Sequence, residues 1–213
     1  MLEECGLPYT LRPVNIGRGE QFDPDFIKIS PNGRIPAIVD LDGPGGKPLA
    51  EFETGAILQY LGRKSGKFYP ADERARVEVD QWLFWQVAGL GPMAGQAQHF
   101  RQTAPEKIPY AIDRYTNETH RLYQVLERRL ADRDYIAGKY SIADIACLTW
   151  IMGHASQGQT IEEFPRLKAW LQRVQARPGV QRGLAIGHEL RFPQVAPNTA
   201  LTRSIQAGDT KPR

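Results

Sequence analysis

Two short stretches of the sequence combine residue types that can hold the amino-acid end of a small peptide. In Ile35-Pro36, a proline at the start of a predicted strand can take the cis form, which would leave the backbone of Ile35 free to pair with an extended ligand. Glu53-Thr54 opens a predicted helix, where unpaired N–H groups and the helix dipole favour an anion. A hydroxyl there can bind a carboxylate, and the glutamate can accept a hydrogen bond from an ammonium group. Together these residues predict a site for a zwitterionic group.

Each of these residues also has a simpler interpretation. Thr54 alone is typical of a helix N-cap, Pro36 of a strand entry, and Glu53 of a solvated surface charge. Only the two motifs together, at this spacing between two strands and a helix, favour a binding site. Glutathione has the required chemistry, because its γ-glutamyl group carries an ammonium and a carboxylate and its peptide can pair with Ile35.

The elements that must position these residues form a small α/β domain over residues 1–66. Alternating polarity predicts strands, with Pro13 suited to a sheet edge, and Asp23-Pro24 is typical of a helix start. The expected elements, in chain order, are a strand at 9–16, a short helix through 26–29, a turn at 30–33, strands at 36–41 and 48–52, and a helix at 54–64.

The rest of the chain predicts an all-helical domain over residues 73–187. Apolar residues have helical spacing in four segments, which are 73–98, 106–131, 142–156 and 163–177. Ser141 with Asp144 fits a helix capping box and is structural in this interpretation. Residues 188–213 hold several prolines and few periodic apolar groups, so we expect a loose tail there.

The composition of the chain argues against several classes of function. The chain has 213 residues, 41% hydrophobic residues and a formal charge of +3, which gives no indication of nucleic-acid binding. Its two cysteines are too few for a disulfide framework and favour a reducing cytoplasm. No apolar run approaches the roughly 20 residues of a membrane span. The four histidines lack the spacing of metal ligands, so we expect no metal.

Several longer motifs resemble one known family. The runs Gly19–Phe22, Ser30–Val39 and Glu53–Leu58 resemble the thioredoxin-like half of cytosolic glutathione transferases. Gln81–Gln96 is similar to the fourth helix of the nu-class disulfide-bond reductases and of their fungal nitrogen-regulator relatives, and two further runs, Ile108–Tyr115 and Tyr140–Ala146, continue the match. The resemblance covers residues 1–187. It implies a thioredoxin-like domain followed by the all-helical domain of a glutathione transferase.

The resemblance also implies site residues. Glutathione would be bound by the backbone of Ile35 beside Pro36 and by the side chains of Glu53 and Thr54. Gln21 would help to hold the glycyl end. Further residues come from the helical domain: Arg114 would reach the ligand, and Met93 and Gln96, after an expected break at Gly91-Pro92, would line the pocket of the second substrate. Helical spacing places Trp82 and Trp85 in the core.

One part of the family pattern has no counterpart in the chain. The family begins with a strand, a loop whose Thr, Ser, Tyr or Cys binds the glutathione sulfur, and a helix, whereas Leu2–Tyr9 matches only the end of that helix. We therefore assign no catalytic residue, and we expect Cys5 to be buried and inert. The domain is expected to lack its first strand, which would lie between the segments 9–16 and 36–41, and so to have an open or rearranged edge.

The expected function is glutathione-dependent disulfide reduction or transfer by a cytoplasmic homodimer. Its co-substrate would be glutathione or glutathione disulfide, and its second substrate a small electrophile or a disulfide. A non-enzymatic glutathione-transferase-like binding or regulatory protein is the alternative, because the catalytic loop has no match. A gene start assigned too late is a third possibility, which the upstream DNA would decide.

Overall fold

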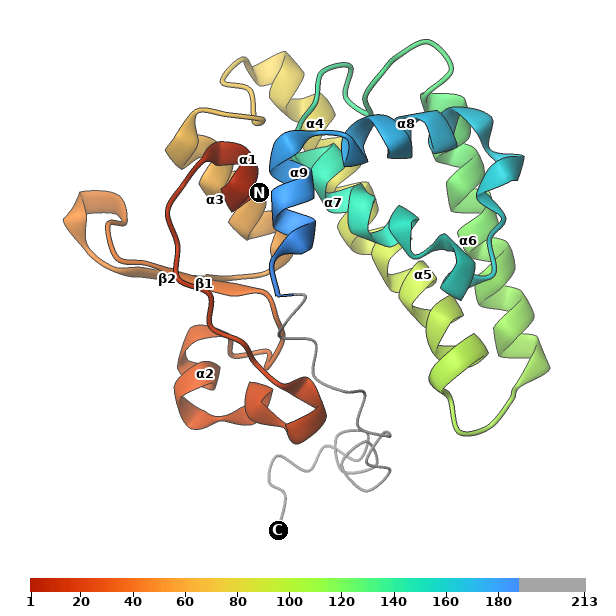
Figure 1. Ribbon diagram of the computed structural model, residues 1–213, viewed down its shortest axis with the longest axis horizontal. Coiled ribbons are helices and arrows are strands. Elements are labelled where there is room, and N and C mark those ends of the chain that lie inside the picture. Colours follow the sequence, from red (N-terminus) through yellow and green to blue (C-terminus); the bar gives the residue numbers. More distant parts are fainter. Residues whose placement is uncertain (188–213) are drawn as a thin grey trace. The chain divides into compact units, whose positions relative to one another are not determined.

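The computed structural model describes residues 1–187, which form two compact units (Figure 1). Among the described residues, one unit is Met1–Leu7 with Leu58–Gly183, and the other is Pro8–Ile57 with residues 184–187. The prediction of a loose tail at 188–213 lies outside the described residues.

The smaller unit is built on a two-stranded antiparallel sheet. Strand β1 (Ala37–Asp40) pairs with β2 (Leu49–Phe52) in a register that places Ala37 opposite Phe52. Helix α2 (Pro24–Ile29) packs against both strands, and its start was predicted correctly, because the Asp23 side chain accepts a hydrogen bond from the Asp25 N–H at 2.9 Å. The hairpin loop contains a 3₁₀ turn, and Gly43 is required in it because a Cβ there would lie 2.5 Å from the Lys47 carbonyl oxygen.

The predicted strand at 9–16 is wrong. Residues 8–15 form no regular element, and a 3₁₀ turn begins at Ile16, capped by the Asn15 side chain, which accepts from the Gly17 N–H at 3.0 Å. A strand is held by ladder hydrogen bonds to a neighbour, and within the described residues neither β1 nor β2 pairs with this segment. Pro13 also removes one backbone donor.

Helix α3 (Thr54–Ser65) confirms the predicted helix at 54–64. Its apolar side is buried as expected, with Ile57, Leu58 and Leu61 all at most 6% exposed. The helix ends where the Ser65 hydroxyl donates to the Leu61 carbonyl at 2.7 Å, and Gly66 follows with a φ of 67°.

The predicted helix at 73–98 is confirmed, but the break expected at Gly91-Pro92 is wrong. Helix α4 (Glu73–Trp85) continues through a π turn, Gln86–Leu90, into α5 (Gly91–Gln98), and Gly91 keeps helical angles of −58° and −56°. The π turn lies where the ring of Pro92 would clash with the preceding turn, and its wider backbone accommodates the proline. A second π turn, His99–Thr103, follows α5.

The remaining predicted helices of the larger unit are confirmed with tighter ends, and one further helix was not predicted. The confirmed ones are α6 (Pro109–Arg129), α7 (Ile142–Met152) and α8 (Pro165–Gln175). Helix α1 (Leu2–Cys5) agrees with the match of Leu2–Tyr9 to the end of a helix, and the helix not predicted is α9 (Pro178–Ala185). Their core includes the fully buried side chains Trp170, Tyr123, Leu83, Leu126, Ile136 and Leu167.

The predicted capping box at the start of α7 is also confirmed. Ser141 and Asp144 bond to each other's backbone N–H groups as such a box requires. Asp144 is fully buried and additionally accepts hydrogen bonds from the Ile136 N–H at 3.0 Å and from the Trp170 indole at 2.8 Å. One carboxylate therefore joins α7, α8 and the loop that precedes α7.

An ion pair between Glu4 and Arg177 joins the first helix of the chain to the C-terminal part of the larger unit. The Glu4 carboxylate accepts two hydrogen bonds from Arg177, at 3.0 and 2.9 Å, and the guanidinium lies 3.6 Å from the centre of the Tyr140 ring. Gly179 allows this approach, because a Cβ there would lie 2.9 Å from the Glu4 Cα.

Candidate functional site

The N-terminus of α3 carries the two residues predicted to anchor a ligand. Glu53 is the residue before the helix, and its carbonyl accepts from the Ile57 N–H at 3.0 Å. Its φ of 71° lies in the left-handed region, which costs a non-glycine residue about 1–3 kcal/mol and is found mostly at functional sites. Glu53 and Thr54 are both exposed. The strained cap therefore presents a carboxylate and a hydroxyl to solvent, beside first-turn N–H groups that lack helical partners.

The Ile35–Pro36 bond is cis, as predicted. Ile35 is 51% exposed, and within the described residues its N–H and carbonyl make no backbone hydrogen bond. The loop before it is held by Ser30, whose hydroxyl donates to the Arg34 carbonyl at 2.8 Å and whose own carbonyl accepts from the Gly33 N–H at 2.8 Å. The backbone groups of Ile35 are thus available on a fixed loop.

The hairpin register brings the two motifs together. Ala37 is paired with Phe52 at the open end of the hairpin, so Ile35-Pro36 directly before β1 and Glu53-Thr54 directly after β2 extend from the same end. The four residues Ile35, Pro36, Glu53 and Thr54 therefore meet at one end of the sheet.

Gln21 differs from the other predicted ligands because it is buried, with 5% of its surface exposed. Its Oε1 has no hydrogen-bond partner within the described residues. Buried acceptors are rarely left unpaired, so this oxygen has the capacity to accept from a ligand N–H. Gln21 also lies beside the loop of Ile35, since a Cβ on Gly33 would lie 3.3 Å from the Gln21 carbonyl oxygen.

In the larger unit, a cleft between α5 and α6 brings together two predicted residues and leaves out a third. The cleft has a volume of about 740 Å³, and Met93 and Arg114 both line it. Gln96 is exposed and is not among the lining residues. Sequence reasoning missed the other lining residues: Tyr110, Asp113, Tyr115, Asn117, Glu118 and Arg121. Four of them lie three, four or seven residues from Arg114 on α6, which is the signal that sequence reasoning could have used, whereas Asp113 and Tyr115 directly flank it.

The two arginines of this cleft differ in their ion pairs. Arg121 is occupied by Glu118, to which it donates two hydrogen bonds of 2.8 and 2.7 Å, and this contact lowers the pKa of the Glu118 carboxyl. Within the described residues, Arg114 has no ion pair. Tyr115 is fixed by a parallel stack on Phe100, with ring centres 5.5 Å apart. The cleft therefore offers an aromatic wall and one guanidinium, that of Arg114, whose charge also helps to lower the pKa of the Glu118 carboxyl.

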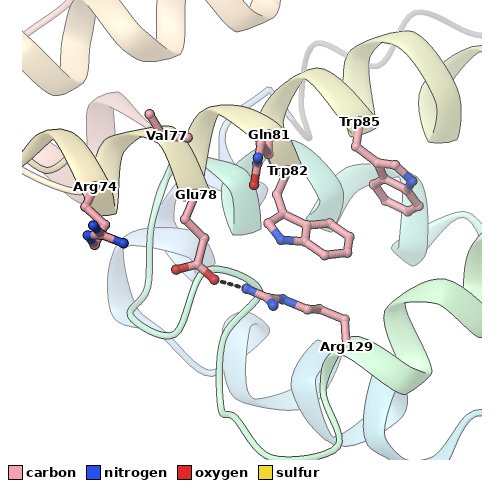
Figure 2. Close-up of a pocket in the computed structure, with 7 residues that line it drawn as sticks. All are labelled: Arg74, Val77, Glu78, Gln81, Trp82, Trp85 and Arg129. Atoms are coloured by element: carbon pink, nitrogen blue, oxygen red, sulfur yellow. Dashed lines mark hydrogen bonds and ion pairs between the residues drawn. The ribbon is translucent and has the colours of Figure 1, made fainter.

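A second cleft, of about 570 Å³, lies between α4 and the end of α6 (Figure 2). The prediction that Trp82 and Trp85 are core residues is wrong, because both are only partly buried and line this cleft. Helix α4 buries Val79 and Leu83 instead, which turns the two indoles to its flank. The Arg129 guanidinium lies 5.0 Å from the centre of the Trp82 ring (Figure 2).

Neither cysteine is placed to act as a nucleophile. Cys5 is 5% exposed, with its Sγ 3.2 Å from the Ser65 hydroxyl, and Cys147 is fully buried. Burial raises the pKa of the Cys147 thiol well above its usual range, so it stays protonated. Residues 1–187 contain no group of three or more His, Cys, Asp or Glu side chains that could hold a metal ion. No helix in the same residues is long and apolar enough to span a bilayer.

The chain matches models of both halves of one family. Residues 1–64 match the glutathione S-transferase N-terminal domain, and residues 94–178 match the C-terminal domain. The chain is 50% identical over 185 residues to the disulfide-bond oxidoreductase YfcG of Escherichia coli, with 86% of each chain covered. It is 37% identical to the disulfide-bond oxidoreductase YghU of the same organism, covering 86% of this chain and 68% of that one.

Solved structures agree with this match. A glutathione transferase from Burkholderia graminis, with two glutathione molecules bound per subunit, is 41% identical with a TM-score of 0.83 and covers 90% of this chain and 82% of that chain. One from Pseudomonas putida, with one glutathione disulfide bound per subunit, is 42% identical with a TM-score of 0.82, covering 87% and 84%. With both family models matched and such relatives covered over most of their length, this chain belongs to the glutathione S-transferase family.

Proposed function

We propose that this protein binds glutathione and reduces disulfides with the thiol of the bound glutathione. The observation that carries the proposal is the 50% identity, over 86% of both chains, to a disulfide-bond oxidoreductase. Similar solved structures contain glutathione or its disulfide, which supports the same ligand. The two free, buried cysteines support a thiol that comes from the ligand, and their reduced state supports a cytoplasmic location.

In this proposal the γ-glutamyl end of glutathione binds at the start of α3. Glu53 accepts from its ammonium group, and the Thr54 hydroxyl and the first-turn N–H groups donate to its carboxylate. The backbone of Ile35, beside Pro36, pairs with the cysteinyl peptide. The unpaired Oε1 of Gln21 accepts from an N–H at the glycyl end.

The α5–α6 cleft serves in this proposal for the second substrate. Met93 and Tyr115 form its apolar wall. Arg114, which the family resemblance assigned to glutathione, offers its guanidinium to a carboxylate at the same cleft. In this proposal the exposed Gln96 side chain turns into the cleft when a substrate binds.

The reaction consumes two glutathione molecules for each disulfide reduced. The thiolate of bound glutathione attacks one sulfur of the disulfide, which forms a mixed disulfide and releases the other sulfur as a thiolate that takes up a proton. A second glutathione thiolate then attacks the mixed disulfide at the glutathione sulfur. The products are glutathione disulfide and two thiols, so two electrons pass from the glutathione pair to the substrate.

A binding or regulatory protein without catalysis is the alternative, and turnover separates the two. We expect the purified chain to accelerate the reduction of bis(2-hydroxyethyl) disulfide by glutathione, measured as glutathione disulfide formed, with a rate that saturates with glutathione. The double variant Glu53→Ala/Thr54→Ala is the control and should lose that saturation. Glutathione binding by calorimetry without any turnover would favour the alternative, and the absence of both would overturn the proposal.

We further propose a homodimer that associates through one face of α4. This face carries, in order, Arg74, Val77, Glu78, Gln81, Trp82 and Trp85, all of which line the second cleft. If two copies of α4 cross antiparallel about the bond between Val79 and Asp80, the face complements itself. Arg74 then meets the indole of Trp85 in the second copy, Val77 meets Trp82, and Glu78 meets Gln81. Such self-complementarity is what a two-fold interface requires.

A further inference from the structure

The α5–α6 cleft contains two oppositely charged side chains that are adjacent in the sequence. Asp113 and Arg114 both line the cleft, and both are exposed. Within residues 1–187, neither side chain takes part in an ion pair or a hydrogen bond. Consecutive residues of a helix point about 100° apart, so these two side chains diverge and do not face each other.

The helical neighbours of the two residues explain why neither charge is paired. The positions three and four residues before and after Asp113 hold no basic residue. Arg114 has Glu118 four residues on, but both carboxylate oxygens of Glu118 accept from Arg121, at 2.8 and 2.7 Å. Arg121, and after it Arg114, lowers the pKa of the Glu118 carboxyl. Asp113 and Arg114 therefore keep their hydrogen-bonding capacity for a ligand.

A ligand that satisfies both side chains carries a cation and an anion close together. A carboxylate accepts hydrogen bonds from an ammonium group, and a guanidinium donates to a carboxylate. An α-amino acid has an ammonium and a carboxylate on one carbon, which suits two residues that are adjacent on one helix. Asn117, four residues beyond Asp113, lines the same cleft and offers a further amide donor and acceptor.

The cleft also has an apolar side for the rest of such a ligand. Met93 is partly buried and lines the cleft, and Tyr115 is held by its stack on Phe100. A methionine side chain is flexible and polarizable, so it packs well against the methylene and sulfur atoms of a disulfide. The cleft volume of about 740 Å³ lies in the range of small-molecule sites, roughly 300–1,000 Å³.

We propose that the second substrate is the disulfide of a free amino acid, L-cystine being the simplest, and that Asp113 and Arg114 select it. This inference rests on the proposed function, in which glutathione supplies the electrons. A glutathione thiolate attacks one sulfur of cystine, which releases one cysteine as a thiolate that takes up a proton. A second glutathione thiolate attacks the mixed disulfide at the glutathione sulfur and releases the second cysteine. Each cystine therefore gives two cysteines and one glutathione disulfide.

Four disulfides of similar size that differ in their charged groups test this proposal. L-Cystine carries an ammonium and a carboxylate on each half, cystamine only the ammonium, 3,3′-dithiodipropionate only the carboxylate, and bis(2-hydroxyethyl) disulfide neither. Each rate with the full chain is divided by the uncatalysed rate with glutathione, because charge alters the reactivity of a disulfide. The normalised kcat/KM for cystine should be at least about tenfold above each of the others, which lack one or both charge-assisted hydrogen bonds.

Two variants separate the contributions of the two charges. Asp113→Asn should lower the ratio of kcat/KM for cystine to that for 3,3′-dithiodipropionate about tenfold, because only cystine has the ammonium. Arg114→Gln should lower the ratio for cystine to that for cystamine about tenfold, because only cystine has the carboxylate. Asp132→Asn and Arg128→Gln remove the same charges at exposed residues outside the cleft and should change either ratio less than about twofold. Thermal unfolding checks that all four variants fold.

The results separate a failure of this inference from a failure of the proposed function. Reduction of bis(2-hydroxyethyl) disulfide that saturates with glutathione, without a preference for cystine over its one-charge analogues, would overturn the inference alone. A preference for cystine that survives both Asp113→Asn and Arg114→Gln would overturn the assignment of these residues. If none of the four disulfides is reduced, the proposed function is wrong and the inference is wrong with it.

Discussion

Glu53 adopts a backbone conformation that its residue type disfavours, at the point where a carboxylate is needed. Glycine would take a φ of 71° without strain, and in this position it would also cap the helix. A glutamate there leaves the backbone strained but places a charged side chain beside the exposed start of α3. Glu53 therefore has two separable effects: its backbone conformation costs stability, and its side chain supplies a carboxylate for binding.

Substitutions at Glu53 can separate these two effects. Glu53→Gly should raise the free energy of unfolding by about 1 kcal/mol, because it relieves the left-handed strain. The same variant should weaken glutathione binding about tenfold, because the acceptor for the ammonium group is lost. Calorimetry and thermal unfolding measure the two effects. A variant that binds unchanged would remove Glu53 from the site.

Thr54→Ala should also weaken glutathione binding about tenfold, through the lost hydrogen bond to a carboxylate. Its matched control is Thr10→Ala, an equally exposed threonine of the same unit, which should leave binding unchanged. If both threonine variants bind like the parent chain, the carboxylate is held by backbone N–H groups alone.

Neither cysteine should matter for turnover. Cys5→Ala and Cys147→Ala remove buried thiols, so each should keep kcat/KM for glutathione-dependent disulfide reduction within about threefold of the parent. Rates measured in the same glutathione concentration series give the comparison. Loss of activity in a folded Cys5→Ala protein would point to a protein thiol in the reaction instead of glutathione alone.

At the scale of elements, local signals predicted best where the chain's own neighbours decide the structure. Asp23-Pro24 and the Ser141–Asp144 box begin helices through contacts within a few residues, and both were predicted correctly. The segment 9–16 was not, because a strand depends on a pairing partner that its own sequence cannot reveal. The cis bond at Pro36 and the carboxylate of Glu53 could be predicted from motifs, whereas the φ of Glu53 and the burial of Gln21 could not.

Which face of a helix is buried also could not be predicted from the sequence of that helix alone. The spacing of Trp82 and Trp85 fits a buried stripe, but the stripe that is buried contains Val79 and Leu83, one residue away along the same helix. Which stripe faces inward depends on the other helices of the unit. The domain boundaries at 66 and 73 also remain a prediction from composition.

The start of α7 depends on one buried carboxylate, which gives a prediction for this element. Asp144→Asn places an N–H donor among the N–H groups that now donate to the carboxylate, and charge-assisted hydrogen bonds are lost. We expect a loss of about 3 kcal/mol of stability and a fall in Tm on the order of 10 °C. Asp132→Asn, at an exposed site beside Arg133, is the control and should leave Tm unchanged. Equal Tm values for the two variants would mean that the box contributes little.

At the scale of the whole molecule, the proposed homodimer can be tested on one helix. Sedimentation of the parent chain at micromolar concentration should give twice the mass of one chain. Val77→Glu, within the proposed α4 face, should shift it to the monomer, because the new carboxylate would be buried against the Trp82 indole of the second copy. Ile108→Glu is the control, because it changes an apolar residue of the same unit that is 40% exposed, against 46% for Val77, and lies outside α4; it should leave the dimer intact. A dimer that resists the first change or is broken by both would refute this interface.

The ion pair between Glu4 and Arg177 joins residues that are 173 positions apart, and this separation has a consequence during synthesis. At about 5–20 residues per second, Glu4 is made roughly 10 to 35 seconds before its partner. The four-residue helix α1 is far too short to hold its shape alone during that interval. The Glu4–Arg177 ion pair can therefore form, and stabilise α1, only after Arg177 has left the ribosome.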